Sequence, residues 1–238
     1  MKEKIYFIPG LMTDNRLWKR VLPLLDDKYE IVHISIPQST DFDEINKILF
    51  EEFKNEEKIN LLGFSLGGYI ASYFAITYPQ KIKRLFMVAA TASSTPIDEY
   101  EKRKEYLKKV EKGKLKLSYK KALSLVEEKN QNDEDLIKTI IDMFDELGKE
   151  TFISQLTSTL NRKDIFEKLI NLDFPIWIFY SKNDRLLNKE ALKKINLLED
   201  KIKIISLEST SHIIPLEYPK ELANNIKLWM NAFWKLLS

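Results

Sequence analysis

A glycine-flanked serine is the strongest chemical signal in the sequence. Ser65 lies in the run Gly63-Phe64-Ser65-Leu66-Gly67-Gly68, which follows the apolar stretch Ile59–Leu62 and precedes an amphipathic helical pattern. A G-x-S-x-G run between a strand and a helix places the serine hydroxyl on a sharp, strained turn above a sheet. The N-terminus of the following helix has unpaired N–H groups and a partial positive charge, which stabilise an oxyanion. We therefore predict that Ser65 is a nucleophile.

A serine nucleophile needs a base, and the chain contains only two histidines. His33 lies inside the apolar run Glu30–Ile36, so we expect it within a strand and interpret it as a structural residue. His212 lies in a polar loop just beyond the run Ile202–Ser206. Because α/β sheets place their sites in loops beyond the carboxyl ends of parallel strands, we predict that His212 is the base.

The acid that orients the base is predicted to be Asp184, which directly follows the apolar run Ile176–Tyr180. Its carboxylate would fix the imidazole tautomer and stabilise the imidazolium. The loop after the fourth run, residues 89–93, contains no acid, and Asp173 precedes its strand and so lies at the wrong end. An ordinary turn aspartate remains the alternative for Asp184.

Two backbone N–H groups are expected to bind the oxyanion. One belongs to Leu66, the residue after the nucleophile, and the other to the loop after the first strand, where we assign Leu11 and leave Met12 open. Gly10 would let the backbone approach the substrate closely. Met12 and Phe64, which neighbour these donors, are predicted to contact the substrate.

The elements that must position these residues follow an alternating pattern. Six short apolar runs predict strands buried on both faces, as in a parallel sheet: Ile5–Ile8, Glu30–Ile36, Ile59–Leu62, Arg84–Val88, Ile176–Tyr180 and Ile202–Ser206. Helical patterns lie between or after them: Leu17–Leu25, Phe42–Phe53, Leu66–Tyr78, Lys189–Leu198 and Pro219–Leu237. The alternation predicts a doubly wound α/β fold.

The alternation stops between about Pro96 and Asp173, where no strand pattern occurs. Apolar stripes at helical spacing predict about four helices there, including one over residues 136–147 and another over residues 152–160. We expect residues 96–171 to form an all-helical insertion, and residues 1–95 and 172–238 to form the α/β core.

Composition excludes several classes of protein. The chain has 238 residues, 44% of them hydrophobic, with a net charge of +2 and no cysteine. This predicts a globular protein that binds neither nucleic acid nor membranes, and the absence of cysteine favours a reducing compartment, so we expect a cytoplasmic location. The apolar run before Pro9 is too short for the core of a signal peptide. No cofactor or metal is expected, because most zinc sites would need both histidines and one is assigned to catalysis.

Together these motifs resemble the α/β-hydrolase superfamily. The loops around Gly10, Ser65, Asp184 and His212 are similar to its oxyanion loop, nucleophile elbow, acid loop and histidine loop, in the same order. The resemblance implies a serine esterase with a helical cap after the sixth strand of the usual fold. The sequence departs from that pattern because it starts with the strand that usually comes third, so we expect six strands, all parallel. The loop after Ile36 also lacks the usual Asp-x-x-Gly-x-Gly motif and points to small esterase-like proteins.

The predicted reaction is hydrolysis of a small carboxylic ester or thioester through an acyl-enzyme on Ser65. The substrate depends on the helical insertion, whose residues 102–121 contain ten Lys or Arg and two acidic residues, against nine acidic and three basic in residues 127–150. The basic half could dock an acyl carrier protein or the phosphates of coenzyme A, which would resemble the methyl esterases of biotin synthesis. Two solvated faces are the plainer interpretation. Peroxidative or C–C bond hydrolysis, and a non-catalytic small-molecule-binding protein of the same fold, remain open.

Overall fold

The computed structural model describes residues 2–196 and 202–232. Within these residues six strands form one sheet in the order β2-β1-β3-β4-β5-β6, and every neighbouring pair is parallel. The strands are β1 Glu3–Ile8, β2 Tyr29–His33, β3 Ile59–Phe64, β4 Ile82–Val88, β5 Ile176–Ser181 and β6 Lys203–Leu207. The predicted all-parallel α/β sheet is confirmed.

Burial explains the near-continuous apolar runs. All six residues of β3 are buried, as are the last four of β1, because helices cover both faces of the sheet. The edge strand β2 ends at His33, three residues before the predicted end at Ile36. Its neighbour β1 ends at Ile8. The Ile34 N–H donates to the Phe7 carbonyl at 2.9 Å, and among the described residues no further backbone hydrogen bond joins the chain after Ile34 to β1.

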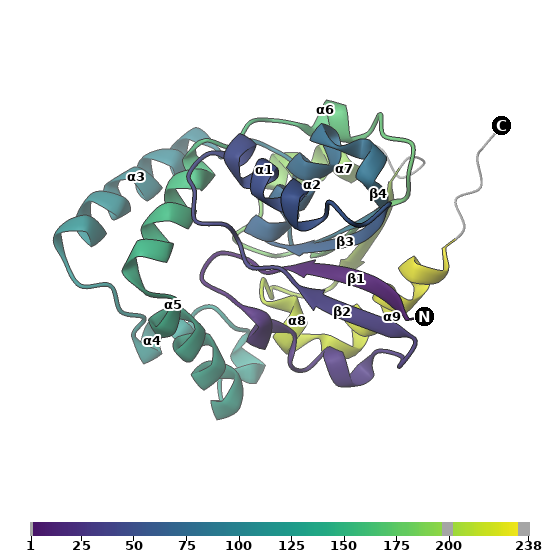
Figure 1. Cartoon of the computed structure of the whole chain (residues 1–238). Coiled ribbons are helices and arrows are strands. Elements are labelled where there is room, and N and C mark those ends of the chain that lie inside the picture. The colour runs from purple at the N-terminus through teal and green to yellow at the C-terminus, as the bar shows by residue number, and fades with distance from the viewer. Residues whose placement is uncertain (1, 197–201, 233–238) are drawn as a thin grey trace.

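The helices divide between the two faces of the sheet (Figure 1). One face carries α1 Phe42–Glu52, α2 Leu66–Thr77, α6 Phe166–Leu169 and α7 Lys189–Asn196; the other carries α8 Ile214–Glu217 and α9 Pro219–Asn231. Each face has its own buried apolar cluster. The predicted helices over 42–53, 66–78 and 189–198 agree with α1, α2 and α7, although Leu198 lies outside the described residues. The helix predicted over 219–237 corresponds to α9, which ends earlier, at Asn231, because Ala232 has extended backbone angles; Phe233 to Leu237 lie outside the described residues.

The predicted helix Leu17–Leu25 is wrong. The chain there forms two short 3-10 turns, η1 Asn15–Trp18 and η2 Leu22–Leu24. Pro23 has no N–H to continue an α-helix. Leu17, Trp18 and Val21 are nonetheless fully buried, which explains the apolar pattern that suggested a helix.

We call residues 96–171 the helical segment; apart from α6, which lies on one face of the sheet, its helices lie beyond the carboxyl ends of the strands (Figure 1). Besides α6 it contains α3 Ile97–Lys112, α4 Tyr119–Leu123, the 3-10 turn η4 Glu128–Asn130 and α5 Glu134–Leu160. The two predicted helices over 136–147 and 152–160 are the two halves of α5, which Gly148 separates with a non-helical φ of 74°. The first half packs on the core of the sheet and the second half packs with α3. No helix among the described residues is long and apolar enough to cross a membrane.

Candidate active site

Ser65 lies at the turn between β3 and α2, where its backbone has a φ of 51°. Two glycines permit this turn. A Cβ on Gly67 would lie 2.1 Å from the Pro9 carbonyl oxygen, and a Cβ on Gly63 would lie 2.3 Å from the Gly67 carbonyl oxygen. The Ser65 N–H donates to the Val88 carbonyl at 2.9 Å, which fixes the turn to the end of β4. Close backbone packing thus holds the serine in a conformation that side chains rarely adopt.

The structure brings Ser65, His212 and Asp184 together. His212 Nε2 lies 2.9 Å from Ser65 Oγ, and His212 Nδ1 lies 2.6 Å from Asp184 Oδ2. The Asp184 side chain is fully buried, and its other oxygen, Oδ1, accepts the Leu186 N–H at 2.8 Å. This arrangement orients one imidazole nitrogen toward the carboxylate and leaves the other to take the serine proton.

Two backbone N–H groups lie where an oxyanion could be bound. Leu66 is the first residue of α2, so its N–H has no acceptor within the helix. The Met12 N–H donates to Gln155 Oε1 of α5 at 2.8 Å, and this hydrogen bond is buried. The Leu11 N–H makes no hydrogen bond within the described part of the chain. Of the two donors left open by the sequence, Leu11 is therefore the one that is free for a ligand.

The two residues predicted to contact substrate have different surroundings. Met12 is buried in an apolar cluster with side chains of α3 and the second half of α5: Leu107, Val110, Phe152 and Leu156. Phe64 is also buried, and its ring lies 5.3 Å from the His212 ring, centroid to centroid. Met12 thus joins the oxyanion loop to the helical segment, and Phe64 packs against His212.

His33 lies at the end of the edge strand β2, and burial lowers the pKa of its imidazole. It lines a cavity of about 390 Å³ between the oxyanion loop, the loop after β2 and the second half of α5. It has no hydrogen bond to Ser65 or Asp184. Asp173 precedes β5, at the opposite end of that strand from Asp184. Among the described residues no group of three or more His, Asp or Glu side chains is arranged to hold a metal ion.

The sequence analysis did not identify two residues of the helical segment that bind the loop around Leu11 and Met12 and the loop before His212. Gln155 fixes the oxyanion loop, and Glu127 accepts hydrogen bonds from Ser209 and Thr210 in the histidine loop. Both contacts join positions more than 80 residues apart, so no local pattern marks them. The one available signal was a glutamine inside an otherwise apolar helical stripe.

A serine, a histidine and an aspartate on loops beyond the ends of a doubly wound parallel sheet define a class of serine hydrolases. The sequence model of the family described as "alpha/beta hydrolase fold" matches residues 5–216. The chain belongs to the α/β-hydrolase fold family, which confirms the predicted superfamily and fold.

Individual relatives agree with the prediction of a carboxylic ester hydrolase. A pimeloyl-[acyl-carrier protein] methyl ester esterase of Wigglesworthia glossinidia brevipalpis is 24% identical over 96% of this chain and 94% of its own length. A biotin biosynthesis bifunctional protein of Teredinibacter turnerae is 25% identical over 95% of this chain, which spans only 44% of that relative. Among solved structures, a thermophilic esterase of Thermogutta terrifontis has a TM-score of 0.82 at 18% identity and covers 97% of this chain and 90% of its own.

Proposed function

We propose that this chain hydrolyses a carboxylic ester or thioester through an acyl-enzyme on Ser65. The observation that carries the proposal is the continuous set of contacts from Ser65 Oγ to His212 at 2.9 Å and from His212 to Asp184 at 2.6 Å. The Ser65 backbone, with its positive φ, presents the hydroxyl at the N-terminus of α2.

The steps follow from this geometry. His212 Nε2 takes the Ser65 proton as Oγ attacks the substrate carbonyl, and the imidazolium formed is stabilised by the Asp184 carboxylate. The carbonyl oxygen becomes an oxyanion that the Leu66 and Leu11 N–H groups bind. His212 then gives its proton to the leaving alcohol or thiol, which departs and leaves the acyl group on Ser65. Water cleaves the acyl-enzyme by the same steps, with His212 again as base.

We further propose that the helical segment is a cap that binds the acyl chain. Met12, beside the oxyanion donor Leu11, packs with Leu107 and Val110 of α3 and with Phe152 and Leu156 of α5. Side chains of this kind line acyl-binding pockets, and the cluster adjoins the loop that carries Leu11. A series of p-nitrophenyl esters of rising acyl length measures the depth of the pocket through kcat/KM.

Labelling with a fluorophosphonate tests whether Ser65 is an activated nucleophile. We expect the parent protein to be labelled and to hydrolyse short p-nitrophenyl esters, and the Ser65→Ala variant to do neither. The Asp184→Asn variant should lose about 10⁴-fold in kcat because the imidazole tautomer is no longer fixed. Equal turnover by the parent and Ser65→Ala would contradict the proposal and leave a small-molecule-binding protein as the alternative.

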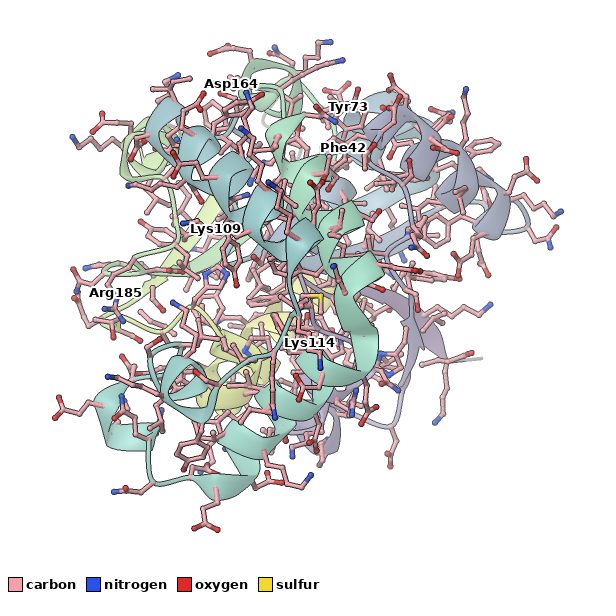
Figure 2. The ribbon with its side chains drawn as sticks, turned by 90° about the vertical axis from the view of Figure 1, so that its left-hand side faces the viewer. Phe42, Tyr73, Lys109, Lys114, Asp164 and Arg185 are labelled. Carbon is pink, nitrogen blue, oxygen red and sulfur yellow. The ribbon has the colours of Figure 1, made fainter. Side chains whose placement is uncertain are left out.

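A second, finer proposal concerns the form of the substrate. We infer that the acyl group is presented on an acidic carrier, such as acyl carrier protein or coenzyme A. Between residues 104 and 121 of the helical segment, eight exposed lysines form no ion pair with a described residue: Lys104, Lys108, Lys109, Lys112, Lys114, Lys116, Lys120 and Lys121. Figure 2 looks toward the helical segment and labels Lys109 and Lys114 there, with Arg185, the neighbour of Asp184, to the left of both. The name of the Wigglesworthia relative, a pimeloyl-[acyl-carrier protein] methyl ester esterase, also supports an acyl carrier protein.

The acidic half of the segment differs from the basic half because ion pairs neutralise much of its negative charge. Asp133 and Asp135 pair with Arg20, Glu146 pairs with Arg16, and Asp142 pairs with Lys138. Four acids of this half, Glu128, Glu134, Asp145 and Glu150, form no ion pair with a described residue, but the eight unpaired lysines on and after α3 outnumber them. The excess of unpaired charge on and after α3 is therefore positive, which favours an acidic partner over a basic one.

A salt series on free and carrier-bound esters tests the carrier proposal. We expect the carrier-bound ester to have the higher kcat/KM at low salt and to lose this advantage as salt rises. The double variant Lys108→Glu/Lys109→Glu should lose the advantage at all salt concentrations, whereas Lys47→Glu/Lys58→Glu, on exposed lysines of the α/β core, should keep it. No preference of the parent for the carrier-bound form would contradict the proposal.

A further inference from the structure

The helical segment holds the loop that carries His212. Glu127 Oε1, just before η4, accepts hydrogen bonds from Ser209 Oγ at 2.8 Å and from the Thr210 N–H at 2.9 Å. Its second oxygen, Oε2, accepts from the Tyr218 hydroxyl at 2.5 Å. A single side chain of the segment therefore binds residues on both sides of His212.

A second carboxylate makes the opposite connection. Glu217, the last residue of α8, accepts the Glu127 N–H and the Asn130 Nδ2 group, each at 2.8 Å, and its other oxygen accepts from Ser211 Oγ. Glu127, in the helical segment, thus binds the loop before His212. Glu217, which follows His212 in the chain, binds the helical segment. We call these contacts the double carboxylate tie.

Ser209 transmits the tie to the catalytic groups. Besides donating to Glu127, its Oγ accepts the Ser211 N–H at 3.0 Å, and its carbonyl accepts the Asn183 N–H at 3.0 Å. Ser211 precedes His212 and Asn183 precedes Asp184 in the chain. Ser209 is only 5% exposed, and it contacts the loop of the base through its hydroxyl and the loop of the acid through its carbonyl.

The charge of Glu127 strengthens the tie. Burial alone would raise the pKa of its carboxyl, but hydrogen bonds from Tyr218, Thr210 and Ser209 outweigh burial and lower this pKa to about 2. Lys129 Nζ lies 3.1 Å from Oε2 and also donates to the Tyr218 hydroxyl. Glu127 is therefore ionised at neutral pH, and hydrogen bonds to an ionised carboxylate are shorter and stronger than neutral ones.

We propose that Glu127 is a positioning residue for His212, acting through Ser209. The inference rests on the proposed hydrolase function, in which His212 Nε2 must face both Ser65 Oγ and the leaving group. Proton transfer tolerates little displacement, and an error of about 1 Å costs about 100-fold in rate. The helical segment therefore contributes to the chemical step and not only to the choice of substrate.

Kinetics of matched variants test this role. Glu127→Ala should lower kcat about 10-fold to 100-fold and leave KM of a short p-nitrophenyl ester within about twofold. Glu127→Gln keeps one acceptor oxygen and should fall between Glu127→Ala and the parent. Glu128→Gln makes the same change of charge on the adjacent, exposed residue and should match the parent. Thermal unfolding of each variant confirms that it is folded at the assay temperature.

A second measurement needs no substrate. The proton of the His212–Asp184 hydrogen bond gives a downfield proton signal by NMR, and a His33→Gln background leaves His212 as the only histidine. We expect this signal to weaken or broaden in Glu127→Ala and to stay unchanged in Glu128→Gln. A Glu127→Ala protein with the parent's kcat and the parent's signal would overturn the positioning role. Equal turnover by the parent and Ser65→Ala would overturn the hydrolase function instead, while the signal would still decide the role of Glu127.

Discussion

The turn that carries Ser65 and the helical segment above it are held in place by different forces. At the turn, backbone packs directly on backbone, and the two glycines leave no room for a Cβ. The helical segment is held by side chains instead: Gln155 on the oxyanion loop, Glu127 on the histidine loop, and Arg20 on Asp133 and Asp135. Substitutions at the turn should therefore lower kcat and stability strongly, whatever the salt concentration and pH. Substitutions in the helical segment should have smaller effects that depend on salt and pH.

The largest effect is expected for Gly67→Ala. The new methyl group would meet the Pro9 and Ile8 carbonyl oxygens at 2.1 and 2.5 Å, so the backbone must move. We expect a loss of about 100-fold or more in kcat and about 3 kcal/mol in the free energy of unfolding. Gly113→Ala, where the nearest atom lies 3.2 Å away at the end of α3, is the control and should change stability by about 0.5 kcal/mol or less. Equal losses of kcat and stability in Gly67→Ala and Gly113→Ala would show that the turn at Ser65 is no more tightly packed than the helical segment.

Gln155→Leu should have the next largest effect. It leaves the buried Met12 N–H without an acceptor, which costs about 1–3 kcal/mol of unfolding free energy. Because the adjacent Leu11 N–H is the proposed oxyanion donor, we expect kcat to fall about 10-fold or more while KM changes less. Ser154→Ala, one residue earlier on α5, is the control. Unchanged kcat in Gln155→Leu would show that the oxyanion loop holds its shape without the helical segment.

A smaller effect is expected at Arg20. Its two amino groups lie 2.7 Å from Asp133 and 3.0 Å from Asp135 at the start of α5. Arg20→Gln should lower the unfolding free energy by about 1 kcal/mol at low salt and by less at high salt, since the pairs are partly exposed. Lys102→Gln breaks a pair in which both partners are mostly exposed, and stability should hardly change. Denaturant unfolding at two salt concentrations measures both, and an Arg20 effect independent of salt would contradict an ionic origin.

The last effect appears only in acid and concerns Glu127. The folded pKa is lowered from 4.5 to about 2, so the carboxylate contributes stability that is fully present above about pH 4.5 and is lost as the pH falls toward 2. The difference in unfolding free energy between the parent and Glu127→Gln should accordingly shrink over this range. Denaturant unfolding at pH values across it provides the measurement. A difference that stays constant from neutral pH to pH 3 would mean that folding does not lower the pKa of Glu127.

The same contrast explains what the sequence could predict. The turn at Ser65 was predictable because its causes are local: a strand, two glycines and a helix within about ten residues. The parallel sheet was predictable because burial on both faces leaves an apolar run in each strand. The helix predicted over residues 17–25 is wrong because the helical spacing of apolar residues there was given more weight than Pro23, which has no N–H to continue an α-helix. Gln155, Glu127 and Glu217 were missed because their partners lie far along the chain, and a single polar residue does not indicate its partner.

Gly148 has a consequence for how such a protein could change its substrate during evolution. On one side of this residue α5 is anchored to the sheet core, and on the other it packs with Met12 and α3. Exchange of the second half of α5 between related proteins would alter the apolar cluster around Met12, the proposed acyl site, without disturbing the anchored half. Glycine is the residue best suited to such a junction, because it adopts the φ of 74° without strain whatever lies on either side. Gly148 would thus allow the second half of α5 to vary in sequence while the first half stays constant.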